Sequence, residues 1–214
     1  MEKIGIIHAA LQSFMQHGIK AISMDDIAKA VGISKRTLYE TFSSKDELVI
    51  SCVEHINEER LRCLNDIFEQ NLDFYDVILK ITYEGISFIQ SVSMQFLLDL
   101  SRFNYRTALE VYTETVNHFC VKLQGLIVEG QRHGFIRPEL DPALMSRILI
   151  NKKPNALKDL AETSGYELRD ILLQLVGVTL RGMSTPEGVK IIDERFNSET
   201  ARKYINSINK PLSE

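Results

Sequence analysis

The chain has 214 residues, of which 44% are hydrophobic and 25% charged, and its formal net charge is −4. This length suffices for one or two globular domains with a buried core, and the composition excludes a disordered or fibrous chain. No apolar run approaches the roughly 20 residues that a membrane-spanning helix needs, so we expect no membrane partner.

The first segment, residues 2–17, predicts an amphipathic helix. Its apolar residues recur at steps of three and four, which places them in one stripe, and Gly18 ends the helix. The segment has no signal-peptide cleavage site. Cys52, Cys63 and Cys120 lie far apart without a C-x-x-C pair, which argues against a disulfide framework or a structural zinc site. We therefore expect a cytoplasmic protein with inert thiols.

Residues 22–48 carry three successive helix-start signals. Ser23 and Asp26 have the spacing of a capping box, and Ser44 and Glu47 repeat it. In such a box the hydroxyl accepts a free backbone N–H at the helix start, while the carboxylate reaches back to the N-cap residue. The segment therefore predicts one helix beginning after Ser23 and another beginning after Ser44.

A third helix is predicted between these two. Ser34 is expected to cap a helix over residues 35–42, and Gly32 lies in the turn before it, where a positive φ is favoured. Two short helices joined by a tight turn that contains glycine form the helix-turn-helix pattern. The second helix of that unit can enter the major groove of DNA.

The spacing of the second helix separates a buried face from an outer face. Ile33, Leu38 and Phe42 are expected to pack inward on the preceding helices. The side chains left outside are those of Lys35, Arg36, Thr37, Tyr39 and Glu40. An outward Tyr beside two cations suits a phosphate contact through its hydroxyl, while the residues at the helix start can reach base edges.

Positive charge is concentrated at this motif. From Lys29 to Lys45 the net charge is +3, although the whole chain is acidic. Lys45 begins the next helix, whose first N–H groups also favour a phosphate. A solvated helical corner has the same spacing, but the caps, the glycine turn, the exposed Tyr and the charge agree on a DNA interface.

Residues 4–48 resemble the DNA-binding domain of the tetracycline-repressor (TetR) family of bacterial transcriptional regulators. The resemblance is carried by Ala10 to Phe14, Gly18, Ser23, Asp26-Ile27-Ala28, Gly32-Ile33-Ser34, Thr37-Leu38-Tyr39, Phe42, Ser44-Lys45 and Leu48. It implies an all-α homodimer that binds a near-palindromic operator on double-stranded DNA. It also implies release, as from a repressor, when a small-molecule effector enters the C-terminal domain.

The resemblance also implies which residues contact DNA. The family's contacts carry over to Ser23, Ser34, Lys35, Thr37, Tyr39 and Lys45. Two residues depart from the family pattern: Arg36 replaces a frequent Gly, and Thr41 replaces a frequent His. We expect Arg36 to add a base or phosphate contact, and these departures leave the operator sequence open.

The sequence predicts that the remainder of the chain is also helical. Residues 45–68 contain no Gly or Pro and predict a stiff helix that could act as a lever. Further helices are expected over residues 74–91, 94–102, 107–133, 142–150 and 166–183, followed by a short helical tail and a possible last helix at 198–208. Residues 151–165 predict an exposed loop or a short helix. We expect a DNA-binding domain over residues 1–48 and an effector-binding and dimerisation domain over 49–214.

The helix over residues 166–183 is apolar on most of its circumference and must be covered on both sides. A central core helix of the monomer would satisfy this. With the resemblance, we favour a dimer interface in which helices 142–150 and 166–183 pair with their copies in a four-helix bundle.

An effector site is expected among the helices of residues 74–133. The candidate lining residues are Phe88, Gln95, Phe96, Tyr112 and Phe119. Pockets for small molecules are mostly apolar with a few placed polar groups, although each of these aromatic side chains taken singly fits an ordinary core better. No charge cluster demands an ionic ligand, so we expect a neutral or amphipathic effector.

Two other classes of protein fit parts of the sequence. A dimeric helical adaptor without DNA binding would share the apolar helices, but the intact run from Lys35 to Tyr39 argues against it. A helical metal-dependent enzyme could use Glu114 with His118, or Glu129 with His133, each pair four residues apart. The chain has no HExxH, P-loop or GxSxG motif. We expect neither an enzyme nor a bound metal or cofactor.

Overall fold

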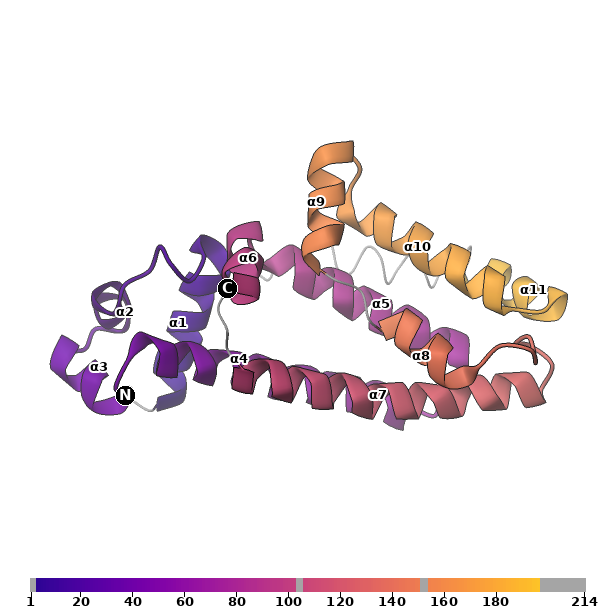
Figure 1. Ribbon diagram of the computed structural model, residues 1–214, viewed down its shortest axis with the longest axis horizontal. Helices are drawn as coiled ribbons and strands as arrows, with labels where there is room; N and C mark the ends of the chain where they lie inside the picture. The colour runs from indigo at the N-terminus through magenta and orange to yellow at the C-terminus, as the bar shows by residue number, and fades with distance from the viewer. Residues whose placement is uncertain (1–2, 103–105, 151–153, 197–214) are drawn as a thin grey trace. The chain divides into compact units, whose positions relative to one another are not determined.

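The computed structural model describes residues 3–102, 106–150 and 154–196 (Figure 1). Within these ranges the chain forms eleven helices, and apart from an isolated bridge between Ile136 and Ser184 it forms no strand. The predicted all-α class is confirmed. Among the described helices, none has the length and apolar character needed to cross a membrane.

The chain divides into two compact units. The first comprises residues 1–63 and 90–115, and the second comprises residues 64–89 and 116–214. The long helices α4 (Lys45–Glu69) and α7 (Arg106–Arg132) therefore each contribute residues to both units. The functional boundary expected between residues 48 and 49 stays a prediction.

The first unit is built around a small three-helix head. It holds α1 (Lys3–His17), α2 (Met24–Val31), α3 (Lys35–Thr41), the first part of α4, and α6 (Met94–Arg102). Helix α1 packs on α2 and α6, and α2 packs on α3. The side chains at the centre of the head are almost completely buried: Ile6, Ala10, Phe14, Ile19, Ile27, Leu38, Phe42 and Leu48. The predicted inward packing of Leu38 and Phe42 is confirmed.

A buried carboxylate joins α6 to the turn between α1 and α2. Asp99 is fully buried, and its Oδ2 accepts the backbone N–H of Lys20 at 2.9 Å. Its Oδ1 accepts from the side-chain amide of Gln95 at 2.8 Å. Gly18 begins this turn with a φ of 85°, which a residue with a side chain rarely adopts. These hydrogen bonds satisfy the buried charge and hold α6 against the head.

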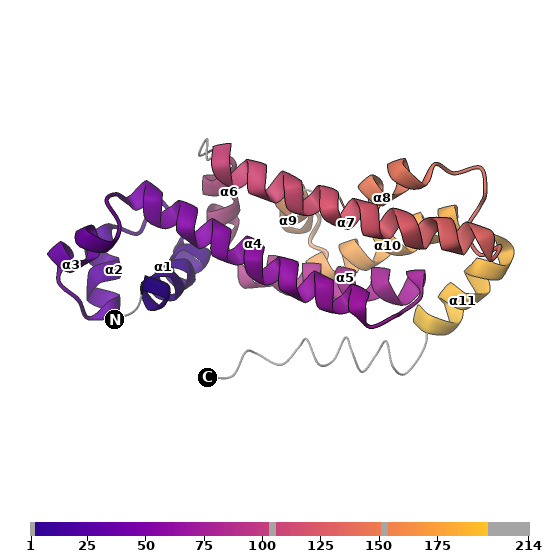
Figure 2. The ribbon, with the colours of Figure 1, turned by 90° about the horizontal axis from the view of Figure 1, so that it is seen from below.

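The second unit is mainly helical over its described residues (Figure 2). It contains parts of α4 and α7 together with α5 (Phe74–Ser91), α8 (Pro142–Ile150), α9 (Pro154–Ser164), α10 (Leu168–Met183) and α11 (Pro186–Phe196). The observed limits of α5 are those predicted from the sequence. For residues 151–165 the sequence left open a loop or a short helix, and residues 154–164 form a helix. Helix α10 packs on α9 and on α11. The possible helix at 198–208 lies outside the described residues.

Two apolar clusters form the core of the second unit. The larger joins α5, α7, α8, α10 and α11 through Phe74, Tyr75, Ile78, Leu123, Ile127, Ile136, Leu149, Val176, Leu180, Met183 and Ile192. The smaller joins α5, α9 and α10 through Leu79, Tyr83, Ile86, Ile89, Leu157, Leu168 and Leu172. Helix α10 contributes to both clusters, so one of its faces is covered within a single chain.

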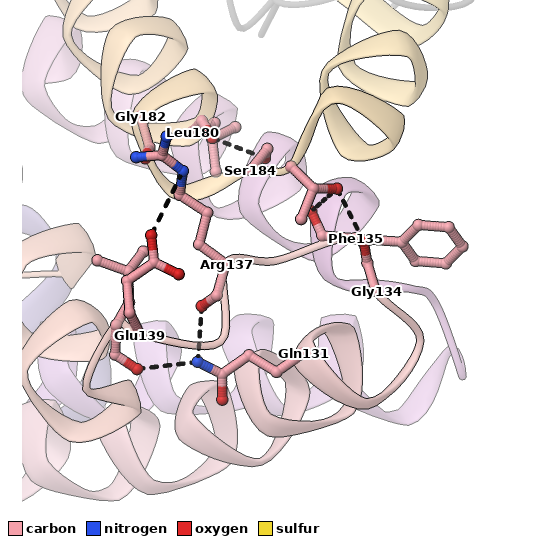
Figure 3. Close-up of polar contacts among 10 residues, drawn as sticks. Gln131, Gly134, Phe135, Arg137, Glu139, Leu180, Gly182 and Ser184 are labelled. Carbon is pink, nitrogen blue, oxygen red and sulfur yellow. Dashed lines mark hydrogen bonds and ion pairs between the residues drawn. The ribbon is translucent and has the colours of Figure 1, made fainter.

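The turn after α7 is fastened to the junction between α10 and α11 (Figure 3). Gly134 ends α7 with a φ of 75°, as expected for a glycine at a helix C-terminus. The N–H of Arg137 donates to the Met183 carbonyl at 2.9 Å, and the N–H of Thr185 donates to the Phe135 carbonyl at 3.0 Å. These two hydrogen bonds flank the isolated bridge and fix the start of α11.

A side chain of α7 also stabilises this turn through hydrogen bonds to its backbone. The side-chain amide of Gln131, near the end of α7, donates to the carbonyl oxygens of Arg137 at 3.0 Å and Leu140 at 2.8 Å. Asp141 then accepts the N–H of Leu144 at 2.7 Å and caps α8. These hydrogen bonds connect the end of α7 to the start of α8.

Candidate nucleic-acid interface

Helix α2 begins with a complete capping box. The Asp26 N–H donates to Ser23 Oγ at 3.2 Å, and Asp26 Oδ2 accepts the Ser23 N–H at 2.9 Å. The hydrogen bonds from Ser23 lower the pKa of the Asp26 carboxyl. The carboxylate therefore stabilises the helix start while it is ionised, and this contribution is lost as the pH falls through its lowered pKa.

The turn and the second cap place α3 as the helix-turn-helix pattern requires. Gly32 adopts the left-handed conformation with a φ of 73°, and its N–H donates back to carbonyls of α2. Ser34 Oγ accepts the Thr37 N–H at 3.0 Å and lies 2.8 Å from Thr37 Oγ1. Both expectations from the sequence are confirmed, and α3 is held at its first turn by side chains that also face solvent.

The start of α4 differs in one detail from its expected capping box. Ser44 Oγ accepts the Glu47 N–H at 3.1 Å, as predicted. The Glu47 carboxylate, however, accepts from the N–H and hydroxyl of Ser43, at 2.8 and 2.6 Å, and not from Ser44. The predicted contact from Glu47 back to Ser44 is therefore wrong by one residue, because the adjacent Ser43 offers the carboxylate the same kinds of donor.

The outer face of α3 is exposed over its whole length. Its members are Lys35, Arg36, Thr37, Tyr39 and Glu40. The Lys35 ammonium pairs with Asp25 of α2 at 2.7 Å, and the Arg36 guanidinium pairs with Glu40 at 2.9 Å. Hydrogen bonding to Asp25 raises the pKa of Lys35, so it stays charged. Exposed ion pairs are weak because water screens them, so DNA phosphates can replace these carboxylates as partners.

Tyr39 stands on this outer face beside the cations. Its side chain is 43% exposed, whereas Leu38, the residue before it, is fully buried. A fully buried Tyr would be explained by packing, but a large part of this side chain is open to solvent. The orientation expected from the sequence is confirmed, and its phosphate contact stays a prediction.

Two further lysines flank α3. The Lys45 ammonium lies 5.9 Å from the centre of the Phe14 ring, and partial burial lowers the pKa of Lys45. The ammonium itself therefore lies partly desolvated against the head at the start of α4, and its contact with a phosphate stays a prediction. The Lys3 ammonium lies 5.2 Å from the ring of Phe42, the C-cap residue of α3. Lys3 is a cation near this surface that the spacing of residues 22–48 does not reveal.

The seven residues expected to contact DNA therefore fall into two groups. Ser34, Lys35, Arg36, Thr37 and Tyr39 lie together on α3 or at its N-cap. Ser23 and Lys45 lie at the N-terminal ends of α2 and α4, where backbone N–H groups favour an anion. Sequence reasoning missed Asp25, the partner of Lys35, because the pairing joins residues ten positions apart on different helices.

The residues expected to line an effector site are divided between the two units. Gln95 and Phe96 belong to the first unit, where Phe96 is 2% exposed and Gln95 is engaged with Asp99. Phe88 and Phe119 belong to the second unit, where Phe119 stacks on Phe68 and Phe88 packs against the smaller apolar cluster. The side chain of Tyr112 lies outside the described part of the chain. A site formed by these residues stays a prediction.

The two helices expected to pair in a dimer expose large apolar side chains. On α8, Leu144 is 55% and Ile148 47% exposed, and on α10, Leu175 is 44% and Val178 70% exposed. Their opposite faces enter the larger cluster through Leu149, Val176 and Leu180. A single chain therefore leaves part of the apolar circumference of both helices uncovered.

Comparison with known proteins agrees with this arrangement. The family model described as bacterial regulatory proteins, tetR family, matches residues 6–52. The transcriptional regulator YhgD of Bacillus subtilis is 24% identical over 147 residues, which cover 68% of this chain and 76% of that protein. The transcriptional repressor KstR2 of Rhodococcus jostii is 23% identical over 190 residues, which cover 85% of this chain and 90% of that protein.

Solved structures share the fold along most of the chain. The regulator FadR from Bacillus subtilis, in complex with stearoyl-CoA, superimposes with a TM-score of 0.66 and 17% identity, over 85% of this chain and all of that one. The ketosteroid transcriptional regulator KstR2 of Mycobacterium tuberculosis superimposes with a TM-score of 0.55 and 17% sequence identity, and the match covers 84% of this chain and 93% of that one. The matched family model and the capped, exposed α3 together support a DNA-binding transcriptional regulator with a tetR-type head at residues 6–52, and the solved structures show that the chain shares the fold of such regulators.

Proposed function

We propose that the protein is a ligand-responsive repressor that binds a near-palindromic operator as a homodimer and has no enzymatic activity. The observation that carries the proposal is the outer face of α3, where cations and Tyr39 stand exposed on a helix capped by Ser34. Related proteins are named as transcriptional regulators, and KstR2 of Rhodococcus jostii is named a repressor. The uncovered apolar residues of α8 and α10 support the homodimer.

The proposal is tested by selecting bound sequences from a random DNA pool at a stated salt concentration. A dimer with two reading heads selects two inverted half-sites separated by about one helical turn or a multiple of it. Affinity for the selected sequence should fall as salt rises, because phosphate contacts release counterions. A protein freed of bound ligand that enriches no sequence would favour the helical adaptor.

We infer that the effector is an amphipathic molecule with a long or broad apolar part. The similar fold of FadR is known in complex with stearoyl-CoA, an amphipathic molecule with a long acyl chain. A ligand lowers DNA affinity only if it binds the DNA-free state more tightly than the DNA-bound state. Stearoyl-CoA should therefore lower operator affinity, whereas free coenzyme A, which lacks the acyl chain, should not. Equal effects of the two would contradict an apolar effector.

Replacing Tyr39 with Phe tests the phosphate contact. The variant keeps the ring and removes the hydroxyl, so it should weaken binding about tenfold, as expected for one hydrogen bond to a charged group. The loss should be similar for the selected operator and its single-base variants, because phosphate contacts carry no direct sequence information. Fluorescence anisotropy titrations measure this, and a loss confined to one sequence would assign Tyr39 to base recognition.

Replacing Arg36 with Ala tests base reading at the residue where the chain departs from the family pattern. We expect a change of about 1–3 kcal/mol in discrimination at one base position, with stability nearly unchanged because the pair with Glu40 is exposed. Glu40→Gln is the matched control, since it breaks the same pair and keeps Arg36. If Glu40→Gln shifts the preferred sequence equally, the effect belongs to the ion pair and not to base contact.

A further inference from the structure

The first unit contains a cluster of two imidazoles and a carboxylate on α1 and α4. His8 of α1 and His55 of α4 meet with their Nε2 atoms 2.9 Å apart. Glu59, one turn further along α4, places Oε1 3.4 Å from His55 Nε2. Across the described ranges, this is the one place where three such side chains bring ligand atoms within 4.8 Å of one another.

Local packing fixes two of these side chains relative to each other. The Cys52 thiol lies buried on α4 and donates to the Ile7 carbonyl of α1 at 3.6 Å. This contact sets His55, three residues later on α4, against His8, the neighbour of Ile7. The His55 side chain is 11% exposed and Glu59 is 59% exposed. The cluster therefore has an anchored ligand at its base and an open side through which an ion can enter.

The distances fit a coordination sphere. With Zn–N bonds of about 2.0–2.1 Å, two tetrahedral ligand atoms lie roughly 3.3 Å apart. The separation of His55 from Glu59 already matches this value. His8 needs to withdraw from His55 by a few tenths of an ångström and to approach Glu59, since the three ligand atoms lie within 4.8 Å of one another. Because His8 is exposed, its side chain can make this adjustment. Two imidazoles and a carboxylate suit zinc and similar transition ions, whereas magnesium and calcium prefer oxygen ligands alone.

We propose that His8, His55 and Glu59 form a binding site for a divalent transition cation of the zinc class, which clamps α1 to α4 within the first unit. The ion replaces the hydrogen bond between the two imidazoles with two coordination bonds, and water completes the sphere. Because the ion binds the folded arrangement of both helices, it stabilises the folded first unit. The sequence alone predicts no metal site, since His8 and His55 are 47 positions apart.

The test is a titration of the full-length, untagged protein with zinc chloride, followed by calorimetry and thermal unfolding. We expect one ion per chain and a higher unfolding temperature with zinc than with magnesium. His8→Asn and Glu59→Gln should each weaken zinc binding roughly 100-fold, the upper end of the loss seen when a metal site loses a supporting partner. Both side chains are exposed, so these variants should fold as the parent does.

His133→Gln is the matched control. His133 is also exposed, with Glu129 four residues before it on α7, but no third ligand joins this pair within the described residues. The control should bind zinc as the parent does. Absence of saturable binding, or equal losses in His133→Gln and His8→Asn, would overturn the proposal. A thiolate charge-transfer band with cobalt(II) would assign the ion to a cysteine and would also overturn it.

Discussion

A Val178→Asp variant is expected to be monomeric and to lose about 100-fold or more of its affinity for the full operator. Val178 is 70% exposed on α10, one turn from the exposed Leu175. If this face pairs with its copy, the substitution buries an unpaired carboxylate on each side of the dimer, at a cost of about 3–5 kcal/mol. Because two linked heads gain a factor of about 10² to 10⁴ over one, losing the dimer removes this gain.

Leu160→Asp is the control for this prediction. Leu160 is 48% exposed on α9, outside the two helices proposed to pair, so the same chemical change should leave the dimer intact. Light scattering measures the mass of each variant, and anisotropy titrations compare the whole operator with a single half-site. Affinity for the half-site should be unchanged in Val178→Asp, because the head is untouched. A dimeric Val178→Asp protein with full operator affinity would place the interface elsewhere.

Local signals allowed much of the head to be predicted from the sequence. Ser23, Gly32 and Ser34 act on backbone groups within four residues, so their spacing is sufficient to place the starts of α2 and α3 and the turn between them. The inward packing of Leu38 and the exposure of Tyr39 follow from helical periodicity in the same way. The caps and the outer face of the candidate DNA site are therefore largely encoded locally.

The features that the sequence did not reveal depend on contacts between distant residues. Asp99 lies 79 positions from Lys20, and no local pattern shows that it satisfies the backbone of the turn after α1. Lys35 pairs with Asp25 only because the turn at Gly32 folds α3 back on α2. At the start of α4 the sequence could not show which serine donates to the Glu47 carboxylate, since Ser43 and Ser44 carry the same donor groups. Periodicity carries no information on such pairings.

The start of α11 shows how tightly such a distant contact can constrain one residue. Gly188 lies in the first turn of α11, against the Tyr75 hydroxyl of α5 and the Phe135 carbonyl. That hydroxyl donates to the Phe135 carbonyl at 3.1 Å and lies 2.8 Å from Ser184 Oγ. Burial raises the pKa of Tyr75, although the hydrogen bond with Ser184 opposes this shift. The glycine therefore leaves room for a buried hydrogen-bond network that ties α5 to the junction of α10 and α11.

Gly188→Ala is accordingly expected to destabilise the protein by about 3 kcal/mol. A β-carbon would overlap the Phe135 carbonyl and the Tyr75 hydroxyl and lie 3.0 Å from Ser184 Cβ, so it forces overpacking and breaks buried hydrogen bonds. The unfolding temperature should fall by on the order of 10 °C. Gly85→Ala is the control: its β-carbon meets no atom within 4 Å, so alanine should stabilise α5 by about 0.5–1 kcal/mol. Opposite shifts from one chemical change would show that the contact at Gly188, and not helix propensity, determines the effect. A Gly188→Ala protein that melts at or above the parent temperature would mean that α11 does not pack on Tyr75 in solution.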